Sequence, residues 1–382
     1  MNNQWQIYFL SIISFLIGTS QFIIVGVLDK IALSLHISIA SAGQLVSVYA
    51  LASAIGTPLL IVAMAKMNQR IQLIASMILF IAGIFSMLLF ENYFFIILSR
   101  IIVGIGAGVF VVMAYGMSAA LAKPGEKGQA MSNIAMGFSI ALVFGVPLGR
   151  MITALLNWQA IFWFIGVLSV LCLSVLIKTL PKTVNEAPVS LRIQLAYLKQ
   201  PKVVSSLMVT FLFFVSYTLI YAYITPFLTS IRILSENEMS VILMLLGVAS
   251  FIGSKLAGVL SDRLGTEKTL LGSISVHFIM LLLLVVAHHS LNMSAMLLFI
   301  WITASWTFGP AQSINLASLI PSASGIMLSL NSSFVQLGFA IGAGIGGVAI
   351  AHASILALCG ISLCFIGFSF YFMRLSFRYS LH

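Results

Sequence analysis

Apolar residues form long, nearly continuous blocks along the whole chain, and short polar breaks separate them. The blocks are about 20 residues long, which is the length that an α-helix needs to cross the hydrocarbon core of a bilayer. Strands of a membrane β-barrel would alternate apolar and polar residues, so continuous blocks indicate helices. The pattern predicts an all-α membrane protein with twelve transmembrane helices, at residues 7–29, 41–65, 71–90, 94–121, 129–154, 159–179, 203–230, 238–260, 269–287, 293–318, 325–350 and 353–373.

The longest polar stretch, residues 181–202, falls near the middle of the chain and contains three prolines. It predicts a cytoplasmic linker between an N-terminal bundle of six helices, residues 1–180, and a C-terminal bundle of six, residues 203–382. Within the linker, the segment LRIQLAYL (191–198) suits a short amphipathic helix on the membrane surface.

The two predicted halves repeat one another in sequence. Three sets of residues match at an offset of 197: ASAIGTPL (52–59) with ASFIGSKL (249–256), Lys66 with Arg263, and Gly145-x-Pro147-x-Gly149 with Gly342-x-Gly344-x-Gly346. Two parallel six-helix repeats are typical of transporters that rock around a solute site between their halves, near the bilayer midplane.

Charge is scarce and mostly basic. Of the 382 residues 61% are hydrophobic and 7% charged, and the net charge is +10. The basic residues are scattered over short loops without clustered aromatics, which argues against nucleic-acid binding and indicates membrane orientation. Twelve helices place both termini on one side of the membrane. We take this side as the cytoplasm of a bacterial cell, because most basic residues lie there. They are Lys66, Arg70, Lys123, Lys127, Lys178, Lys182, Arg192, Lys199, Lys202, Arg263, Lys268, Arg374 and Arg378.

The first apolar block follows no basic residue and precedes no cleavage site, so we interpret it as a retained span rather than a signal peptide. The three cysteines lie in apolar blocks without paired spacing, which argues against a disulfide framework or a zinc site. No catalytic constellation, phosphate-binding loop or metal cluster stands out. The sequence therefore predicts neither an enzyme nor a bound cofactor.

The loop GVLSDRLGTEK (258–268) resembles the cytoplasmic loop signature of the major facilitator superfamily, in residues Gly258, Asp262, Arg263, Gly265 and Lys268. The resemblance implies a gate latch, in which Gly258 allows close helix approach and Asp262 caps and pairs. The alternative is a basic loop that serves only orientation. The matching loop of the first half, IVAMAKMNQR (61–70), lacks the glycines and the aspartate, so that half of the latch is expected to be weaker.

Two further segments extend the resemblance. SRIIVGIGAGV (99–109) is similar to the superfamily's Arg-x-x-x-Gly-x-Gly pattern and contains Arg100 inside a predicted span, where a charge is costly and indicates function. Snorkelling of Arg100 to the outer interface is the alternative. GFSIALVFGVPLGR (137–150) resembles the antiporter motif of exporters in Gly145, Pro147 and Gly149, which are implied to bend and gate, although Arg150 stands where a second glycine is usual.

The resemblance covers essentially the whole chain and extends to ISIASAGQLVSVYALASAIGTP (37–58), YTLIYAYITPFL (217–228), WTFGPAQS (306–313) and LNSSFVQLGFAIGAGIGG (330–347). Together these segments resemble the drug:proton antiporter branch, which includes bacterial purine or nucleoside and arabinose-type sugar efflux transporters. The resemblance implies export in exchange for protons. Relatives in this branch often carry an acidic residue immediately before Phe22, where this chain has Gln21.

Amide and aromatic side chains inside the predicted spans are the candidate solute ligands. Rings can stack on a neutral planar heterocycle while amides meet its polar edges, and a sugar suits the same set. Bridging between helices is the alternative for about half of them, and packing is an alternative for Tyr49 and Trp301. The candidates are Gln21, Tyr49, Tyr115, Asn133, Tyr217, Tyr221, Trp306, Gln312, Asn315, Asn331 and Gln336.

None of the eight acidic residues is predicted near the bilayer midplane. Asp29 and Arg100 lie at similar predicted depth, and a pair between them with a proton competing for Asp29 is the coupling hypothesis. The alternative is a solvated helix-end acid beside Lys30. His277, inside the ninth predicted span, is expected to be a hydrogen-bonded structural residue, with proton handling as the alternative.

The sequence therefore predicts a secondary active exporter with the major facilitator fold, working as a monomer in the lipid bilayer. Its partners are a small neutral solute and protons, and nucleic acid is not among them. A multidrug exporter of lipophilic cations would usually need a membrane-embedded acid. A transport-inactive sensor on the same fold is the second alternative.

Overall fold

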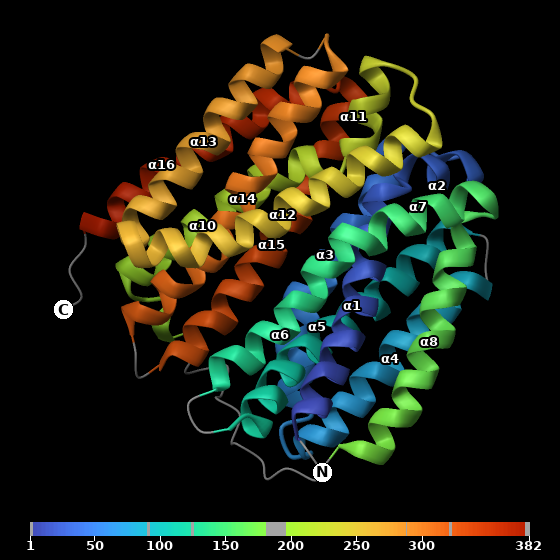
Figure 1. The fold of residues 1–382 in the computed structure, drawn as a ribbon, viewed down its shortest axis with the longest axis vertical. Coiled ribbons are helices and arrows are strands. Elements are labelled where there is room, and N and C mark those ends of the chain that lie inside the picture. The colour runs from blue at the N-terminus through green and yellow to red at the C-terminus, as the bar shows by residue number, and fades with distance from the viewer. Residues whose placement is uncertain are drawn as a thin grey trace. The chain divides into compact units, whose positions relative to one another are not determined.

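The computed structural model describes residues 3–89, 92–123, 126–180, 196–287, 289–320 and 323–378. Within this part the chain folds as α-helices, and twelve of them are long and apolar enough to cross a membrane (Figure 1). The all-α membrane fold predicted from the sequence is confirmed. The predicted ends lie within four residues of the observed ones, except that the seventh span ends at Tyr221 rather than at 230.

The helices of the first half are α1 (Asn3–Gly26), α2 (Leu28–Ser34), α3 (Ile39–Ala63), α4 (Gln69–Leu89), α5 (Tyr93–Leu121), α6 (Lys127–Ile140), α7 (Val146–Leu155) and α8 (Trp158–Thr179). Those of the second half are α10 (Pro201–Tyr221), α11 (Ile224–Ile231), α12 (Glu236–Leu264), α13 (Thr266–Ala287), α14 (Leu291–Leu319), α15 (Ser324–His352) and α16 (Ala357–Arg378). Most of the predicted linker and of its surface helix lies outside the described residues.

The described residues form two compact units. Unit 1 contains residues 3–37 together with those from Val48 to the end of α8, and unit 2 contains Ser38–Ser47 together with the helices from α10 onward. The start of α3 thus packs in unit 2: Ser47 donates a hydrogen bond to the carbonyl of Ala340 in α15, at 2.6 Å. The sequence predicts these ten residues, 38–47, to be part of the N-terminal bundle.

The first helix of each half is broken near one end, where the sequence predicted continuous spans. In the second half the break at Ala222 and Tyr223 has a clear cause, because Pro226 lacks an N–H and its ring would clash with the carbonyl of Ala222 in a continuous helix. In the first half the break falls at Val27. The repeat offset places Asp29 at the position of Pro226, and a carboxylate in the first turn of α2 is favoured by the helix dipole.

Small residues let the fifth span of each half pack closely on the first. In unit 1, Gly137, Gly145 and Gly149 face α1, and a Cβ on Gly137 would lie 3.0 Å from the backbone nitrogen of Phe15. In unit 2, Gly338, Gly342 and Gly346 face α10 in the same way. Without these glycines the helices would have to separate, as expected for small residues at four-residue spacing in membrane helices.

The fifth span is also interrupted. A π-helical turn, Ala141–Gly145 (η1), separates α6 from α7. Pro147 follows it directly and cannot donate to the carbonyl of Val143, so the wider turn accommodates both the missing hydrogen bond and the ring. The bend expected from the Gly-x-Pro-x-Gly segment is therefore a local π-turn; its role in gating stays a prediction.

The loop signature at residues 258–268 is only partly explained by packing. Gly265 has a φ of 85° and ends α12, where its N–H donates to the carbonyl of Ser261 at 3.1 Å, as a helix-terminating glycine should. The close helix approach expected at Gly258 is wrong, because a Cβ there would meet nothing within 4 Å. Asp262, Arg263 and Lys268 are exposed.

In the first-half loop that matches residues 258–268, side-chain amides bind the backbone groups of the turn between α3 and α4. Asn68, at a glycine position of the signature, caps α4 by accepting from the N–H of Ile71 at 2.9 Å. Gln72 donates to the carbonyls of Met64 and Met67. Arg70 donates to the carbonyl of Ile177 in the last turn of α8, where a positive charge also complements the helix dipole.

Glycine-to-alanine substitutions test the packing. We expect Gly137→Ala and Gly342→Ala to lower the free energy of unfolding by about 1–3 kcal/mol, because the added methyl groups meet backbone atoms that cannot move aside alone. Thermal unfolding in detergent, followed by size-exclusion chromatography, measures the effect. Gly360→Ala and Gly367→Ala are matched controls in α16, where the methyl group meets nothing within 4 Å, and they should be neutral or stabilising. Equal losses in both pairs would contradict the packing argument.

Candidate functional site

Unit 1 contains a buried cluster of Arg100, Tyr49 and Gln21. The guanidinium of Arg100 (α5) lies 4.5 Å from the ring centroid of Tyr49 (α3), and its Nη1 donates to the carbonyl of Ser20 at 3.3 Å. The hydroxyl of Tyr49 donates to Oε1 of half-buried Gln21 at 3.5 Å. The cation–π contact and the carbonyl stabilise a fully buried charge. Three residues predicted for solute binding or coupling therefore lie together.

The glycines around Arg100 explain how its helix fits. A Cβ on Gly104 would overlap the backbone of Tyr49, and one on Gly108 would meet Ser53 and Thr57, so both allow α5 to approach α3. Gly106 faces α4 instead, where a Cβ would lie 2.7 Å from the nitrogen of Phe80. The glycine pattern after Arg100 thus positions the arginine through backbone contact with two helices.

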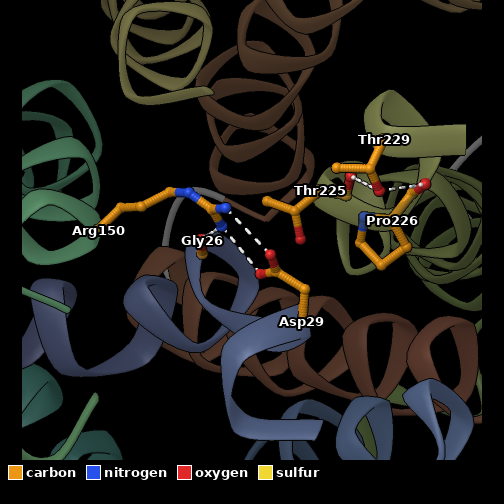
Figure 2. A network of polar contacts seen from close by, with 6 residues as sticks. All are labelled: Gly26, Asp29, Arg150, Thr225, Pro226 and Thr229. Atoms are coloured by element: carbon orange, nitrogen blue, oxygen red, sulfur yellow. Dashed lines mark hydrogen bonds and ion pairs between the residues drawn. The ribbon is translucent and has the colours of Figure 1, made fainter. Parts of the chain in front are cut away.

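The second polar feature of unit 1 is an ion pair between Asp29 and Arg150. Both carboxylate oxygens of Asp29 (α2) accept from the two terminal nitrogens of Arg150 (α7), at 2.9 and 3.0 Å (Figure 2). The Arg150 side chain is 3% exposed and that of Asp29 is 20% exposed. A bidentate pair of this kind combines charge with a fixed geometry.

Arg150 also holds the break in the first helix. Its Nη1 donates to the carbonyl of Gly26, the last residue of α1, at 2.7 Å. One guanidinium thus satisfies a free carbonyl at the end of α1 and the carboxylate at the start of α2. At the other end of α2, Ser34 accepts from the indole nitrogen of Trp158 at 3.0 Å.

These contacts correct the expected pairing of Asp29 with Arg100: the partner of Asp29 is Arg150. The sequence did show Arg150 as a departure from a glycine position, but no role was assigned to it. An arginine inside a membrane span needs a counter-charge, and this signal would have pointed to the nearby acid.

Unit 2 contains an aromatic cluster centred on Tyr217 (α10). The Tyr217 ring stacks on Tyr221 at a centroid distance of 5.0 Å and on Trp301 (α14) at 5.1 Å. Its hydroxyl accepts from the indole nitrogen of Trp306 at 3.1 Å. Tyr217 and Trp301 are buried, whereas Trp306 is half-buried. The predicted ligands Tyr217, Tyr221 and Trp306 therefore lie in one cluster, and Trp301, interpreted from the sequence as a packing residue, stacks on Tyr217.

The predicted amide ligands of unit 2 are bound to other side chains. Gln312 (α14) donates to the carbonyl of Ser206 at 2.8 Å, and Asn315 donates to the hydroxyl of Ser206 at 3.2 Å. Asn331 (α15) accepts from Thr210 at 2.9 Å. All five residues are buried, so these amides bridge α10, α14 and α15, which is the alternative that the sequence left open.

The remaining candidates are half-buried residues: Tyr115 and Asn133 in unit 1 and Gln336 in unit 2. The break between α10 and α11 has no charged residue like that of unit 1. There the hydroxyl of Tyr223 donates to the carbonyl of Ala343 at 2.7 Å, and Thr229 donates to the carbonyls of Thr225 and Pro226 (Figure 2).

In the part of the chain that the structure describes, twelve helices are long enough to span a membrane and fall into two units, as in many membrane transporters built from repeats. The family model described as Major Facilitator Superfamily matches residues 10–343 and 206–380. The chain belongs to this superfamily, and it is a transporter rather than an enzyme.

Known relatives agree with this assignment. The chain is 39% identical over 358 residues to the uncharacterized MFS-type transporter YbcL of Bacillus subtilis (strain 168), covering 94% of this chain and 92% of YbcL. Among solved structures, a mutant of the nucleoside transporter NupG matches with a TM-score of 0.78 and 14% identity, covering 98% of this chain and 100% of that one. A D-xylose-proton symporter matches with a TM-score of 0.78 and 16% identity, covering 98% and 97%. The two structures show a shared fold.

A double-mutant cycle tests the buried ion pair. Asp29→Asn leaves the Arg150 charge without its counter-charge, so we expect a loss of about 1–3 kcal/mol in the free energy of unfolding. Arg150→Met alone should also destabilise, and the double variant should lose less than the sum of the two.

Thermal unfolding in detergent measures the four proteins of the cycle. The matched control is the exposed pair of Arg232 and Glu238, whose side chains are 56% and 46% exposed. Arg232→Met, which leaves the Ser235–Glu238 capping box of α12 in place, should leave stability unchanged within error, because exposed pairs contribute little. Strict additivity of the Asp29 and Arg150 changes would show that the pair has no coupling energy.

Proposed function

We propose that the protein is a secondary active exporter that moves a small neutral solute, a purine base or nucleoside or a sugar-like molecule, out of the cell. It works in the bacterial cytoplasmic membrane, with both termini in the cytoplasm, by alternating access and in exchange for protons. The observation that carries the solute class is the aromatic cluster of unit 2, formed by Tyr217, Tyr221 and Trp306.

The chemistry of this cluster suits a flat, uncharged ring. Aromatic side chains stack on such a ring, and the tyrosine hydroxyls supply polar groups at its edge, while the Trp306 N–H orients the Tyr217 hydroxyl. Trp306 is half-buried, so it is the member of the cluster that a solute reaches first, while Tyr217 is buried. NupG is a nucleoside transporter and another structural neighbour is a xylose symporter, which supports the same two solute classes.

A cationic solute fits this unit less well. In the described part of unit 2, the acidic residues Glu236, Glu238, Asp262 and Glu267 all lie at helix ends. A lipophilic cation stacked on Tyr217 would therefore have no carboxylate in contact, and a buried unpaired charge is unfavourable. The direction of transport rests on the resemblance of residues 137–150 to the antiporter motif of exporters.

The Asp29–Arg150 pair is the proposed coupling site, in place of the expected Asp29–Arg100 pair. A proton on Asp29 removes the negative charge that holds Arg150, and Arg150 also binds the end of α1 at Gly26. Protonation thus loosens the break between α1 and α2. Arg100, held by Tyr49 beside Gln21, connects α5 to α1 and α3 at the same time.

Transport into inside-out vesicles tests the solute class. With an acidic vesicle interior we expect accumulation of labelled hypoxanthine or adenosine, or of labelled xylose if the solute is sugar-like. Trp306→Ala should raise KM about tenfold because a stacking surface is lost, and Trp306→Phe should restore most of the affinity. Trp163→Ala, at an exposed tryptophan of α8, is the control. Vesicles that accumulate none of these solutes, or that accumulate an organic cation instead, would contradict the proposal.

The coupling site makes a separate prediction. Asp29→Asn should abolish accumulation driven by the pH gradient, while exchange of labelled for unlabelled solute continues, because exchange needs no net proton movement. Asp29→Glu should retain part of the driven accumulation. Glu238→Gln, which neutralises an exposed acid, is the matched control. Undiminished driven accumulation in Asp29→Asn would exclude Asp29 as the proton site.

A further inference from the structure

His277 lies at a junction of four helices of unit 2. It belongs to α13 and is completely buried. Its Nε2 lies 3.1 Å from the hydroxyl of Ser216 in α10, and its Nδ1 lies 2.9 Å from the hydroxyl of Ser305 in α14. Ser216 in turn contacts the hydroxyl of Ser362 in α16 at 2.7 Å. One imidazole ring thus connects α10, α13, α14 and α16.

The serine hydroxyls offer a partner to both nitrogens of a neutral imidazole ring. Ser305 donates its single hydrogen to the carbonyl of Trp301 at 2.7 Å, so toward His277 it acts as an acceptor. With Ser305 in this role, Nδ1 of the neutral ring donates to Ser305 and Nε2 accepts from Ser216. Ser362 donates to the carbonyl of Ser216 at 2.8 Å. Both nitrogens of an uncharged histidine thus have a hydrogen-bonding partner.

This chain of hydrogen bonds ends directly beside the aromatic cluster. Its last acceptor is the carbonyl of Trp301, and the Trp301 ring lies 5.2 Å from the imidazole on one side and 5.1 Å from Tyr217 on the other. Phe213 packs on the imidazole at 4.9 Å. A change at His277 therefore reaches Tyr217 through one intervening ring.

We propose that His277 is a positioning residue that sets the place of Trp301 and, through it, of the Tyr217 ring, and so determines the affinity for a planar solute. The inference rests on the proposed function of the aromatic cluster. His277 acts on the solute through Trp301 rather than by contact, because the Trp301 ring packs against both the imidazole and the Tyr217 ring. Its hydrogen bonds to two helices hold α14 in register with α10.

A proton-carrying role for His277 is the competing explanation. The Ser216 hydroxyl has a second acceptor, the carbonyl of Ser362 at 3.0 Å, so it can turn away and let Nε2 donate. In the part of the chain that the structure describes, however, the ring's partners are hydroxyls and aromatic rings, without a carboxylate. A buried imidazolium without a counter-charge is unfavourable, which favours the neutral ring.

A fluorescence experiment tests the positioning without any solute. In full-length protein with Trp5, Trp158, Trp163 and Trp306 replaced by phenylalanine, the emission comes from Trp301 alone. His277→Leu removes both hydrogen bonds and should shift this emission to longer wavelength and increase its quenching by acrylamide. His277→Asn keeps a donor for Ser305 and should give a smaller shift. His352→Asn, at an exposed histidine of α15, should give none.

A transport experiment tests the consequence. In otherwise unmodified protein, His277→Leu should raise KM for hypoxanthine about tenfold with little change in the maximal rate, because the stacking surface is displaced rather than the transport cycle blocked. His277→Asn should recover part of the affinity, and both variants should keep the pH dependence of the unmodified protein. If His277→Leu does not fold, Ser305→Ala cuts the same chain between His277 and Trp301 and replaces it in both experiments.

The two experiments separate the possible outcomes. Unchanged Trp301 emission in His277→Leu, or in Ser305→Ala where it replaces that variant, overturns the positioning role. Loss of pH-driven accumulation in His277→Asn, with KM unchanged, would assign His277 to proton handling instead. If unmodified protein moves no hypoxanthine, adenosine or xylose, the proposed function fails, while the emission experiment still decides whether His277 positions Trp301.

Discussion

Close packing of the first span of each half on its fifth span is the contact on which the other features depend. In unit 1 the glycines of α6, η1 and α7 bring that span against α1, and in unit 2 the glycines of α15 bring it against α10. Lipid offers no hydrophobic force that drives helices together, so small residues and dispersion contacts must do so. This approach places the Arg150 side chain within reach of Gly26 and Asp29, and the Tyr223 hydroxyl within reach of Ala343.

Both breaks in the first helices need such partners, because a free carbonyl inside a membrane protein is costly. The contacts at the two breaks run in opposite directions, and the one in unit 2 leaves the break instead of ending on a carbonyl there. In unit 1 a side chain of the fifth span reaches the broken helix, and in unit 2 a side chain of the break reaches the fifth span. The contact in unit 1 uses a charge and therefore requires Asp29 nearby, whereas the contact in unit 2 is neutral. The repeat is thus structural, and the ion pair is the feature that distinguishes unit 1.

The sequence predicted the twelve spans because apolar length alone decides them, but it ended the eighth span at 260, whereas α12 continues to Leu264 and is ended by Gly265. It missed both helix breaks, since Val27 and Tyr223 look like ordinary span residues and only Pro226 carries a local signal. The pairing of Asp29 with Arg150 was also missed, because depth along separate spans does not say which helices touch. Gln312 and Asn315 show the same limit, because the sequence of a span looks the same whether its amide binds a neighbouring helix or a solute.

An amide in a membrane span holds helices together when its hydrogen-bonding groups are already bound to neighbouring helices. Ser206, Thr210, Gln312, Asn315 and Asn331 satisfy one another while fully buried, so they hold α10, α14 and α15 together. Tyr217, Tyr221 and Trp306 lie further along the same helices, and there aromatic faces replace amides. The amides rigidify one end of these helices, His277 and its serines rigidify the region behind the rings, and Trp306 is left half-buried. A surface built in this way is preorganised for stacking, because the residues that hold it in place are not the residues that meet the solute.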